Sequence, residues 1–157
     1  YSRQDRDTTE EVAIRDIIDN ILAISSSRIK PIPVVVEVSD GIDRVAIFPG
    51  KVSQVVGNLV VNAADACRAG DDPRIRVDVS SNAESLLIAV EDNGSGIPEE
   101  IQTKVFDPFF TTKDVGEGTG LGLALCKRFA QEMGGDLVFD TKPGATSFTL
   151  SVPLDES

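Results

Sequence analysis

The chain has 157 residues, the length of one domain, and 41% of them are hydrophobic, which is enough for an ordinary core. The apolar residues form separate short runs, and none approaches the roughly 20 residues of a membrane-spanning helix. The net charge of −11 argues against sequence-independent binding to nucleic acid and against direct contact with an anionic membrane.

The sequence contains no histidine and two cysteines, Cys67 and Cys126, which lie far apart. The sequence has no Cys/His cluster of the kind that binds zinc. A catalytic cysteine would lack a histidine to activate it. We expect two reduced, half-buried thiols in a cytosolic protein. Because the chain starts at Tyr1 and shows no signal peptide, we also expect a cytoplasmic fragment of a longer protein.

The first half of the chain predicts two helices and two strands. Isoleucines at helical spacing predict an amphipathic helix over Glu10–Ile24, and the Ser25–Ser27 run ends it. Two β-branched runs, Pro33–Val38 and Arg44–Phe48, predict strands. A long helix is predicted over Lys51–Arg68, where apolar residues recur every three or four positions.

The second half predicts two hairpins with a long connection and a helix between them. The first hairpin is predicted to pair Arg74–Ser80 with Leu86–Val90. Glu91–Thr119 is a connection rich in glycine and polar residues, with a short helix near Glu99–Lys104. The next helix is predicted over Gly120–Met133 and is ended by two glycines.

The last hairpin is predicted to pair Leu137–Phe139 with Ser147–Val152 around a Lys142–Gly144 turn. The whole order is helix, two strands, helix, hairpin, long connection, helix and hairpin. This order predicts an α+β fold. It would be a two-layer α/β sandwich, with a mixed, mostly antiparallel sheet covered by helices on one face.

Two asparagines four residues apart, Asn58 and Asn62, share one face of the predicted Lys51–Arg68 helix. Asn62 can offer its carbonyl oxygen to Mg²⁺, a hard cation that takes few protein ligands when phosphates supply the others. The alternative is a polar helix flank that bonds neighbouring backbone.

Asp92 stands where an apolar strand enters the Asp92–Gly96 turn. A buried carboxylate needs hydrogen-bond donors, and the exocyclic amine of adenine is one. Gly94 and Gly96 would let the backbone pass close to a flat base. An ordinary turn explains the same residues, since Asp-Asn-Gly is a strong turn signal.

The Gly116–Gly122 segment places four alternating glycines before a predicted helix. Its backbone amides and the helix N-terminus suit phosphate oxygens, although the segment matches neither a P-loop nor a dinucleotide fingerprint. A flexible hinge is the alternative. Phe106, Phe109 and Phe110 can attach a lid to the domain or pack under the loop, and Lys113 can reach a terminal phosphate or stay solvated.

In this order the four motifs resemble the N, G1, F and G2 boxes of the catalytic, ATP-binding domain of bacterial sensor histidine kinases. That domain belongs to a wider group with DNA gyrase, Hsp90 and MutL. The boxes correspond to Gln54–Ala66, Asp92–Gly96, Phe106–Phe110 and Gly116–Gly122, and the similarity covers residues 33–153. It implies a Bergerat-type ATP-binding fold with a flexible ATP lid, and Mg-ATP as the ligand.

The resemblance also implies roles for individual residues. Asn58, Asn62 and Lys113 would form the catalytic set, with Asn62 as the Mg²⁺ ligand, and Asp92 would accept a hydrogen bond from the adenine amine. The implied nucleotide contacts are Asp92, Gly94, Gly96, Ile97, Phe109, Gly116, Gly118, Thr119, Gly120, Leu121, Gly122 and Thr146.

Two departures sharpen the expected chemistry. ATP-hydrolysing relatives and the serine kinases of the group place a glutamate, as general base, where this chain has the neutral amide of Asn58. A neutral imidazole already offers a lone pair, so phosphorylation of histidine has less need of that base. Since the chain has no histidine, the phosphoacceptor is expected on a separate dimerisation domain.

We expect residues 1–28 to be a linker and helix from that upstream domain, and residues 29–157 to be the ATP-binding catalytic domain. The other expected partners are ATP and a response regulator, and the whole protein is expected to be a cytoplasmic or membrane-bound sensor. Two alternatives stay open. One is an ATPase or chaperone-like module of the same superfamily, and the other is a non-catalytic nucleotide-binding regulatory domain.

Overall fold

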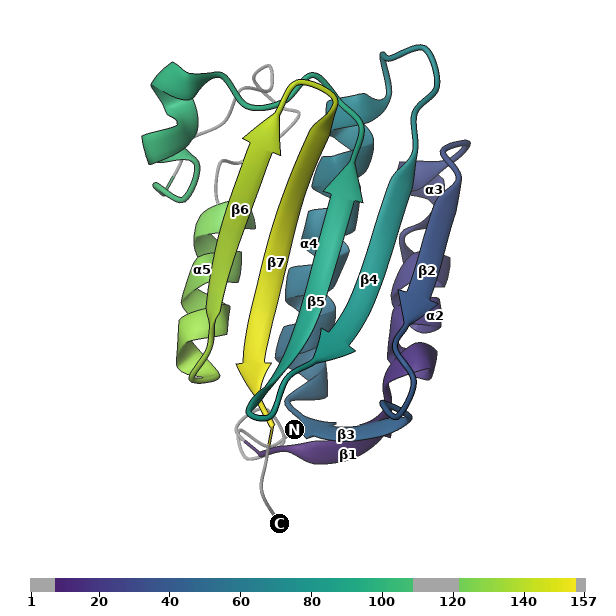
Figure 1. The fold of residues 1–157 in the computed structure, drawn as a ribbon, viewed down its shortest axis with the longest axis vertical. Helices are drawn as coiled ribbons and strands as arrows, with labels where there is room; N and C mark the ends of the chain where they lie inside the picture. Colours follow the sequence, from purple (N-terminus) through teal and green to yellow (C-terminus); the bar gives the residue numbers. More distant parts are fainter. Residues whose placement is uncertain (1–7, 109–121, 155–157) are drawn as a thin grey trace.

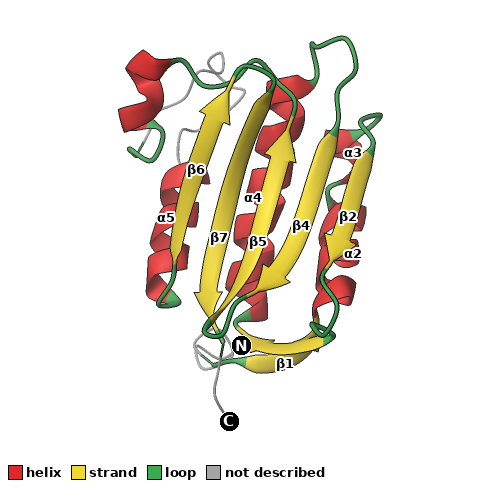
Figure 2. Cartoon of the chain, in the orientation of Figure 1, coloured by secondary structure: helices red, strands yellow, loops and turns green. Residues whose placement is uncertain are grey.

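The computed structural model describes residues 8–108 and 122–154, which form a five-stranded sheet, a two-stranded sheet and several helices (Figure 1). The elements are β1 (Glu10–Ala13), α2 (Ile14–Ile24), α3 (Ser26–Ile29), β2 (Val34–Val38), β3 (Arg44–Ile47), α4 (Pro49–Cys67), β4 (Ile75–Ser81), β5 (Ser85–Asp92), the 3-10 helix η1 (Glu99–Lys104), α5 (Gly122–Glu132), β6 (Asp136–Lys142) and β7 (Ala145–Pro153). Helices α2 to α5 all lie on one face of the large sheet (Figure 2).

The large sheet has the strand order β2-β4-β5-β7-β6. β2 runs parallel to β4, and the three other neighbouring pairs are antiparallel. Both predicted hairpins, β4–β5 and β6–β7, are confirmed. The two-layer arrangement with a mixed, mostly antiparallel sheet is the fold expected from the sequence.

The core fills the space between the large sheet and the helices. In β4, the buried Ile75, Val77 and Val79 alternate with Arg76 and Asp78, whose side chains face away from the helices. On the outer face Arg76 pairs with both Asp78 and Glu37. One face of β4 is therefore apolar and covered, and its other face is polar and open.

Helix α4 lies over the middle of the sheet and supplies much of the core. Its buried residues recur every three or four positions and are Val52, Val55, Val56, Leu59, Val60, Ala63, Ala64 and Cys67. Pro49 begins the helix, where a missing backbone N–H costs nothing. Among the described residues no helix is long and apolar enough to cross a bilayer.

Two expectations were wrong. Glu10–Ala13 does not open a helix but forms β1, which pairs antiparallel with β3 in the small sheet. Helix α2 begins only at Ile14, and the residue at its N-cap, Ala13, offers no side-chain cap that could mark the start. The thiols of Cys67 and Cys126 are fully buried and not half-buried.

Three segments meet at one end of the large sheet, at the top in Figure 1. They are the C-terminal end of α4, the end of β5, and the turn between β6 and β7, with η1 beside them. Residues that are distant in the sequence are thereby brought together at this end.

Candidate functional site

Asp92 is the last residue of β5 and is only 5% exposed. Its carboxylate oxygen Oδ1 accepts a hydrogen bond of 2.8 Å from the backbone N–H of Gly94. Burial raises the pKa of Asp92, and the nearby Glu91 raises it further, while the Gly94 bond opposes both. No lysine or arginine in the described ranges pairs with this carboxylate, so a ligand that donates hydrogen bonds would be its natural partner.

Gly94 and Gly96 are required by close backbone packing. A Cβ on Gly94 would lie 2.5 Å from the carbonyl oxygen of Ala66, near the end of α4. Gly96 has a φ of +91°, and a Cβ there would lie 2.9 Å from the carbonyl oxygen of Lys142. The turn after β5 is thus pressed against α4 on one side and the β6–β7 turn on the other, and Gly144 adds a hydrogen bond from its N–H to the Gly94 carbonyl.

Thr146 is the cross-strand neighbour of Asp92, because β7 pairs with β5 in that register. Its side chain is 4% exposed and shares a hydrogen bond of 2.7 Å with Thr141, its partner in β6. The Thr141 hydroxyl also accepts a 3.0 Å bond from the N–H of Ile97. Asp92, Ile97 and Thr146, all implicated by the sequence motifs, therefore lie around one corner of the sheet.

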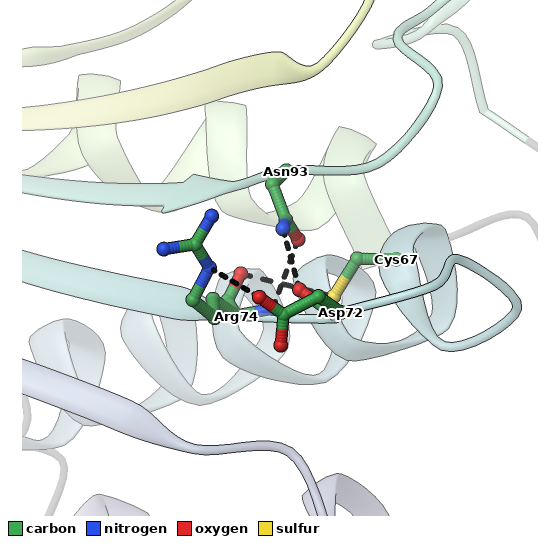
Figure 3. A network of polar contacts seen from close by, with 4 residues as sticks. All are labelled: Cys67, Asp72, Arg74 and Asn93. Atoms are coloured by element: carbon green, nitrogen blue, oxygen red, sulfur yellow. Dashed lines mark hydrogen bonds and ion pairs between the residues drawn. The ribbon is translucent and has the colours of Figure 1, made fainter.

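Asn93 fastens this corner to the loop that joins α4 and β4 (Figure 3). Its Nδ2 donates to the Asp72 carbonyl over 2.7 Å, and its Oδ1 accepts from the Arg74 N–H over 2.9 Å. The Cys67 thiol, at the end of α4, bonds the Arg74 carbonyl over 3.9 Å. Sequence reasoning took Asn93 as part of a turn signal and did not foresee this link, because its partners lie about 20 residues earlier in the chain.

Asn58 and Asn62 lie on α4, as predicted, and both are half-buried. Asn62 comes one helical turn before Ala66, whose carbonyl contacts the Gly94 position, so this face of α4 leads to the Asp92 corner. Within residues 8–108 and 122–154 the Asn62 side chain has no hydrogen-bond partner.

The other asparagine contacts helix α5. The Asn58 Nδ2 donates to the Cys126 Sγ over 3.6 Å, and the Cys126 thiol bonds the Val55 carbonyl over 3.8 Å. Burial raises the pKa of Cys126 to about 11, so the thiol stays neutral. No motif in the sequence pointed to Cys126 as a neighbour of the asparagine pair.

The described part of the long connection ends on an aromatic cluster. The Phe106 ring lies 5.8 Å from Phe139 and 6.3 Å from Phe148, both in edge-on geometry. The Lys127 ammonium of α5 lies 4.9 Å from the Phe106 centroid. Phe106 thus anchors the chain beside α5 and β6. Most of the lid predicted from the sequence lies outside the described residues.

Several predicted site residues lie outside the described residues. They are Phe109, Lys113, Gly116, Gly118, Thr119, Gly120 and Leu121. Gly122 is described. It is the first residue of α5, and among the described residues no atom beyond its chain neighbours and the helix backbone lies within 4 Å of where its Cβ would stand.

The acceptor oxygens at this end of the sheet fit the groups of a metal–nucleotide complex. Asp92 offers a buried acceptor, and Asn62 offers an amide oxygen of the kind that Mg²⁺ takes. The fit therefore rests on two groups: the buried carboxylate of Asp92, which suits a base, and the amide oxygen of Asn62 on the neighbouring face of α4, which suits a metal.

Comparison with known proteins identifies the family of the chain. The family described as histidine kinase-, DNA gyrase B- and HSP90-like ATPase matches residues 49–156, which include every described element of the candidate site. The C4-dicarboxylate transport sensor protein DctB of Pseudomonas aeruginosa is 33% identical over 140 residues, covering 87% of this chain and 23% of that protein. The histidine-protein kinase AtoS of Escherichia coli is 43% identical over 103 residues, covering 65% of this chain and 16% of that protein.

Solved structures of catalytic domains share the fold. The catalytic domain of histidine kinase ThkA superposes with a TM-score of 0.79 at 30% identity, covering 92% of this chain and 97% of that one. The mycobacterial sensor histidine kinase MprB has a TM-score of 0.78 at 26% identity, covering 95% and 99%. The chain spans less than a quarter of the length of the two curated relatives.

Proposed function

The chain belongs to the family of histidine kinase-, DNA gyrase B- and HSP90-like ATPases, and from that premise we propose that it binds Mg-ATP and donates the γ-phosphoryl group to a histidine on a separate dimerisation domain. In this role it is the catalytic part of a two-component sensor kinase, and a response regulator receives the phosphoryl group afterwards. The chain itself has no histidine to accept it.

One observation carries the proposal. The buried acceptor Asp92 and the asparagine face of α4 adjoin, because the Gly94 turn packs against Ala66 one helical turn beyond Asn62. A base held at Asp92 has its sugar and phosphates in reach of that face. A module that only stabilised its own fold would gain little from a buried carboxylate without a cationic partner.

Each residue has a separate task in this proposal. Asp92 accepts a hydrogen bond from the adenine amine, and Thr146 and Ile97 bound the base pocket. Asn62 holds Mg²⁺, and Asn58 orients the groups beside it. Gly116, Gly118, Gly120 and Gly122 bind the phosphates through their backbone amides, and Lys113 binds the terminal phosphate.

Phosphoryl transfer needs positioning and charge neutralisation more than covalent help from the protein. When bound, Mg²⁺ would neutralise part of the phosphate charge, which matters in a chain of net charge −11. Asn58 is an amide and directs its nitrogen to Cys126, so this position supplies no general base for water. Transfer to histidine is therefore favoured over hydrolysis.

The test is a calorimetric titration of the chain with ATP, with and without Mg²⁺, while phosphate release is measured on the same sample. We expect binding with negligible release, and transfer of the phosphoryl group only after a histidine-containing dimerisation domain is added. Asp92→Asn should weaken ATP binding by about 10- to 100-fold, the value of one buried hydrogen bond to a charged group.

Asp140→Asn is the matched control, because Asp140 is an exposed carboxylate on β6, and it should bind ATP as the parent does. Equal affinity of Asp92→Asn and the parent would contradict the adenine assignment. Steady phosphate release would favour the ATPase alternative. A folded sample that bound no ATP would favour a regulatory domain.

A further inference from the structure

The contact between α4 and α5 holds a small polar group that the proposed mechanism leaves unexplained. Cys126 is 0% exposed and comes four residues after the start of α5. A buried cysteine usually acts as a small apolar side chain. This one has two directed contacts, with the Asn58 amide at 3.6 Å and with the Val55 carbonyl at 3.8 Å.

The two contacts have complementary directions. The thiol proton can point to the Val55 carbonyl, which is a pure acceptor, and the sulfur lone pairs are then left to accept from the Asn58 Nδ2. The thiol is neutral, since burial holds its pKa near about 11. A valine at position 126 would put a methyl group in place of the sulfur and add a second one, and it could make neither contact.

Fixing the amide nitrogen also fixes the amide oxygen. With Nδ2 on Cys126, the Asn58 Oδ1 is the remaining polar atom of the amide, and no residue in 8–108 or 122–154 donates to it. Asn62 follows one turn later on the same face of α4. Both amides can then present their oxygens on the side where the proposed function puts the metal and phosphates.

We infer that Cys126 is a positioning residue for Asn58: its thiol holds the amide nitrogen and so turns the carbonyl oxygen toward the metal–phosphate part of the site. The inference rests on the proposed function. It predicts that Cys126 matters for binding of the metal complex and not for binding of the base.

The test is a double-mutant cycle with the parent, Cys126→Val, Asn58→Ala and the double variant, titrated with ATP in Mg²⁺ and in a chelator. Cys126→Val should weaken Mg-ATP binding about fivefold, the effect of one ordinary hydrogen bond. It should leave metal-free ATP binding unchanged. In the Asn58→Ala background it should have no further effect, because the group that Cys126 holds is gone.

Ile18→Val is the control for general loosening of the core, since Ile18 is buried in α2 away from the site. It should change both dissociation constants equally or not at all. If Cys126→Val does not fold, Cys126→Ala removes the sulfur without adding bulk, and the same selective loss is expected.

Three results would overturn the inference. They are an unchanged Mg-ATP constant in Cys126→Val, an equal loss with and without Mg²⁺, and an equal loss in the Asn58→Ala background. Each leaves the proposed function intact, provided that the parent binds Mg-ATP. A parent that bound no ATP would instead remove the proposed function, and this inference with it.

Discussion

At the scale of single residues, the buried carboxylate of Asp92 is well placed to bind a ligand, but it lowers the stability of the ligand-free protein at neutral pH. Burial raises the pKa of its carboxyl, so the folded chain holds the proton more tightly than the unfolded chain, whose value is near 3.8. The contribution of Asp92 to the free energy of unfolding is therefore largest below pH 3.8, and it falls as the pH rises through the higher folded-state pKa. Above that pKa the buried charge is a constant penalty.

Asp92→Asn removes this penalty and keeps an oxygen for the Gly94 N–H. The free energy of unfolding of the ligand-free variant should exceed that of the parent at neutral pH, and the excess should shrink as the pH falls toward 3.8. Denaturant titrations at several pH values would measure it. Asp136→Asn is a control in which the free energy of unfolding should change in the opposite direction. The Lys127 ammonium lowers the pKa of Asp136, so removing the Asp136 charge should destabilise the chain at neutral pH.

Gly94 and Gly50 give a second prediction from the surroundings of two glycines. A Cβ on Gly94 would meet the Ala66 carbonyl oxygen at 2.5 Å, so Gly94→Ala should cost more than about 2 kcal/mol of stability, in the range of overpacked sites. A Cβ on Gly50, in the first turn of α4, would have no atom of the described residues within 4 Å apart from its chain neighbours and the helix backbone, and Gly50→Ala should add about 0.5–1 kcal/mol. Denaturant midpoints of the two variants would measure this, and shifts in the same direction would contradict it.

The sequence predicted Asp92 and the asparagine pair as site residues because their motifs carry local signals, such as a strand entering an Asp-Asn-Gly turn, and it predicted Thr146 through the family resemblance. It could not identify Cys126 or the role of Asn93. Their meaning depends on contacts between α4 and α5, and between β5 and the α4–β4 loop, that span 68 and about 20 residues. A cysteine in an apolar helical stripe looks the same in sequence whether or not it meets an asparagine.

At the scale of elements, long periodic segments were predicted well, and α4 and both hairpins lie where their patterns placed them. β1 was missed because Val12 and Ile14 continue the apolar pattern of α2 backwards and no capping residue separates the two. The pairing of β1 with β3, and the parallel pairing of β2 with β4, join residues that no local signal connects. Strand order is set by packing of the whole sheet.

Lys127 ties three elements together, and its removal gives a prediction at this scale. Its ammonium donates to the Leu137 carbonyl over 2.9 Å, pairs with Asp136 over 2.8 Å and lies over the Phe106 ring. Lys127→Met should lower stability by about 1–2 kcal/mol, because one hydrogen bond, a partly exposed ion pair and a cation–π contact are lost. Amide exchange in η1 should quicken as Phe106 loses this contact.

Arg128→Met tests whether such losses are specific. Arg128 is the next residue, and its ion pair with Glu132 is largely exposed, so the change should stay within about 0.5 kcal/mol and leave η1 exchange as in the parent. Equal effects of the two variants would show that Lys127 acts only through general surface charge.

At the scale of the whole molecule, the sheet and α4 pack around one core, with the candidate site at one end. The resemblance to histidine kinase catalytic domains, drawn from four motifs, is confirmed by the family match and by the structural neighbours. The fold was thus predictable from motif order, whereas the roles of Lys113 and the Gly116–Gly120 segment stay predictions, since they lie outside the described residues.

The net charge of the whole chain yields the last prediction. A protein with a charge of −11 repels the polyanion ATP at long range, and salt screens that repulsion as the Debye length falls from roughly 30 Å at 0.01 M to roughly 8 Å at 0.15 M. Affinity for metal-free ATP should therefore rise by about two- to fivefold over that range of ionic strength. Mg-ATP is less charged, so its affinity should change less. Parallel titrations would measure both slopes. A metal-free affinity that fell steeply with salt would show that local cations outweigh the field of the whole chain, and Mg²⁺ would then be needed for geometry more than for charge.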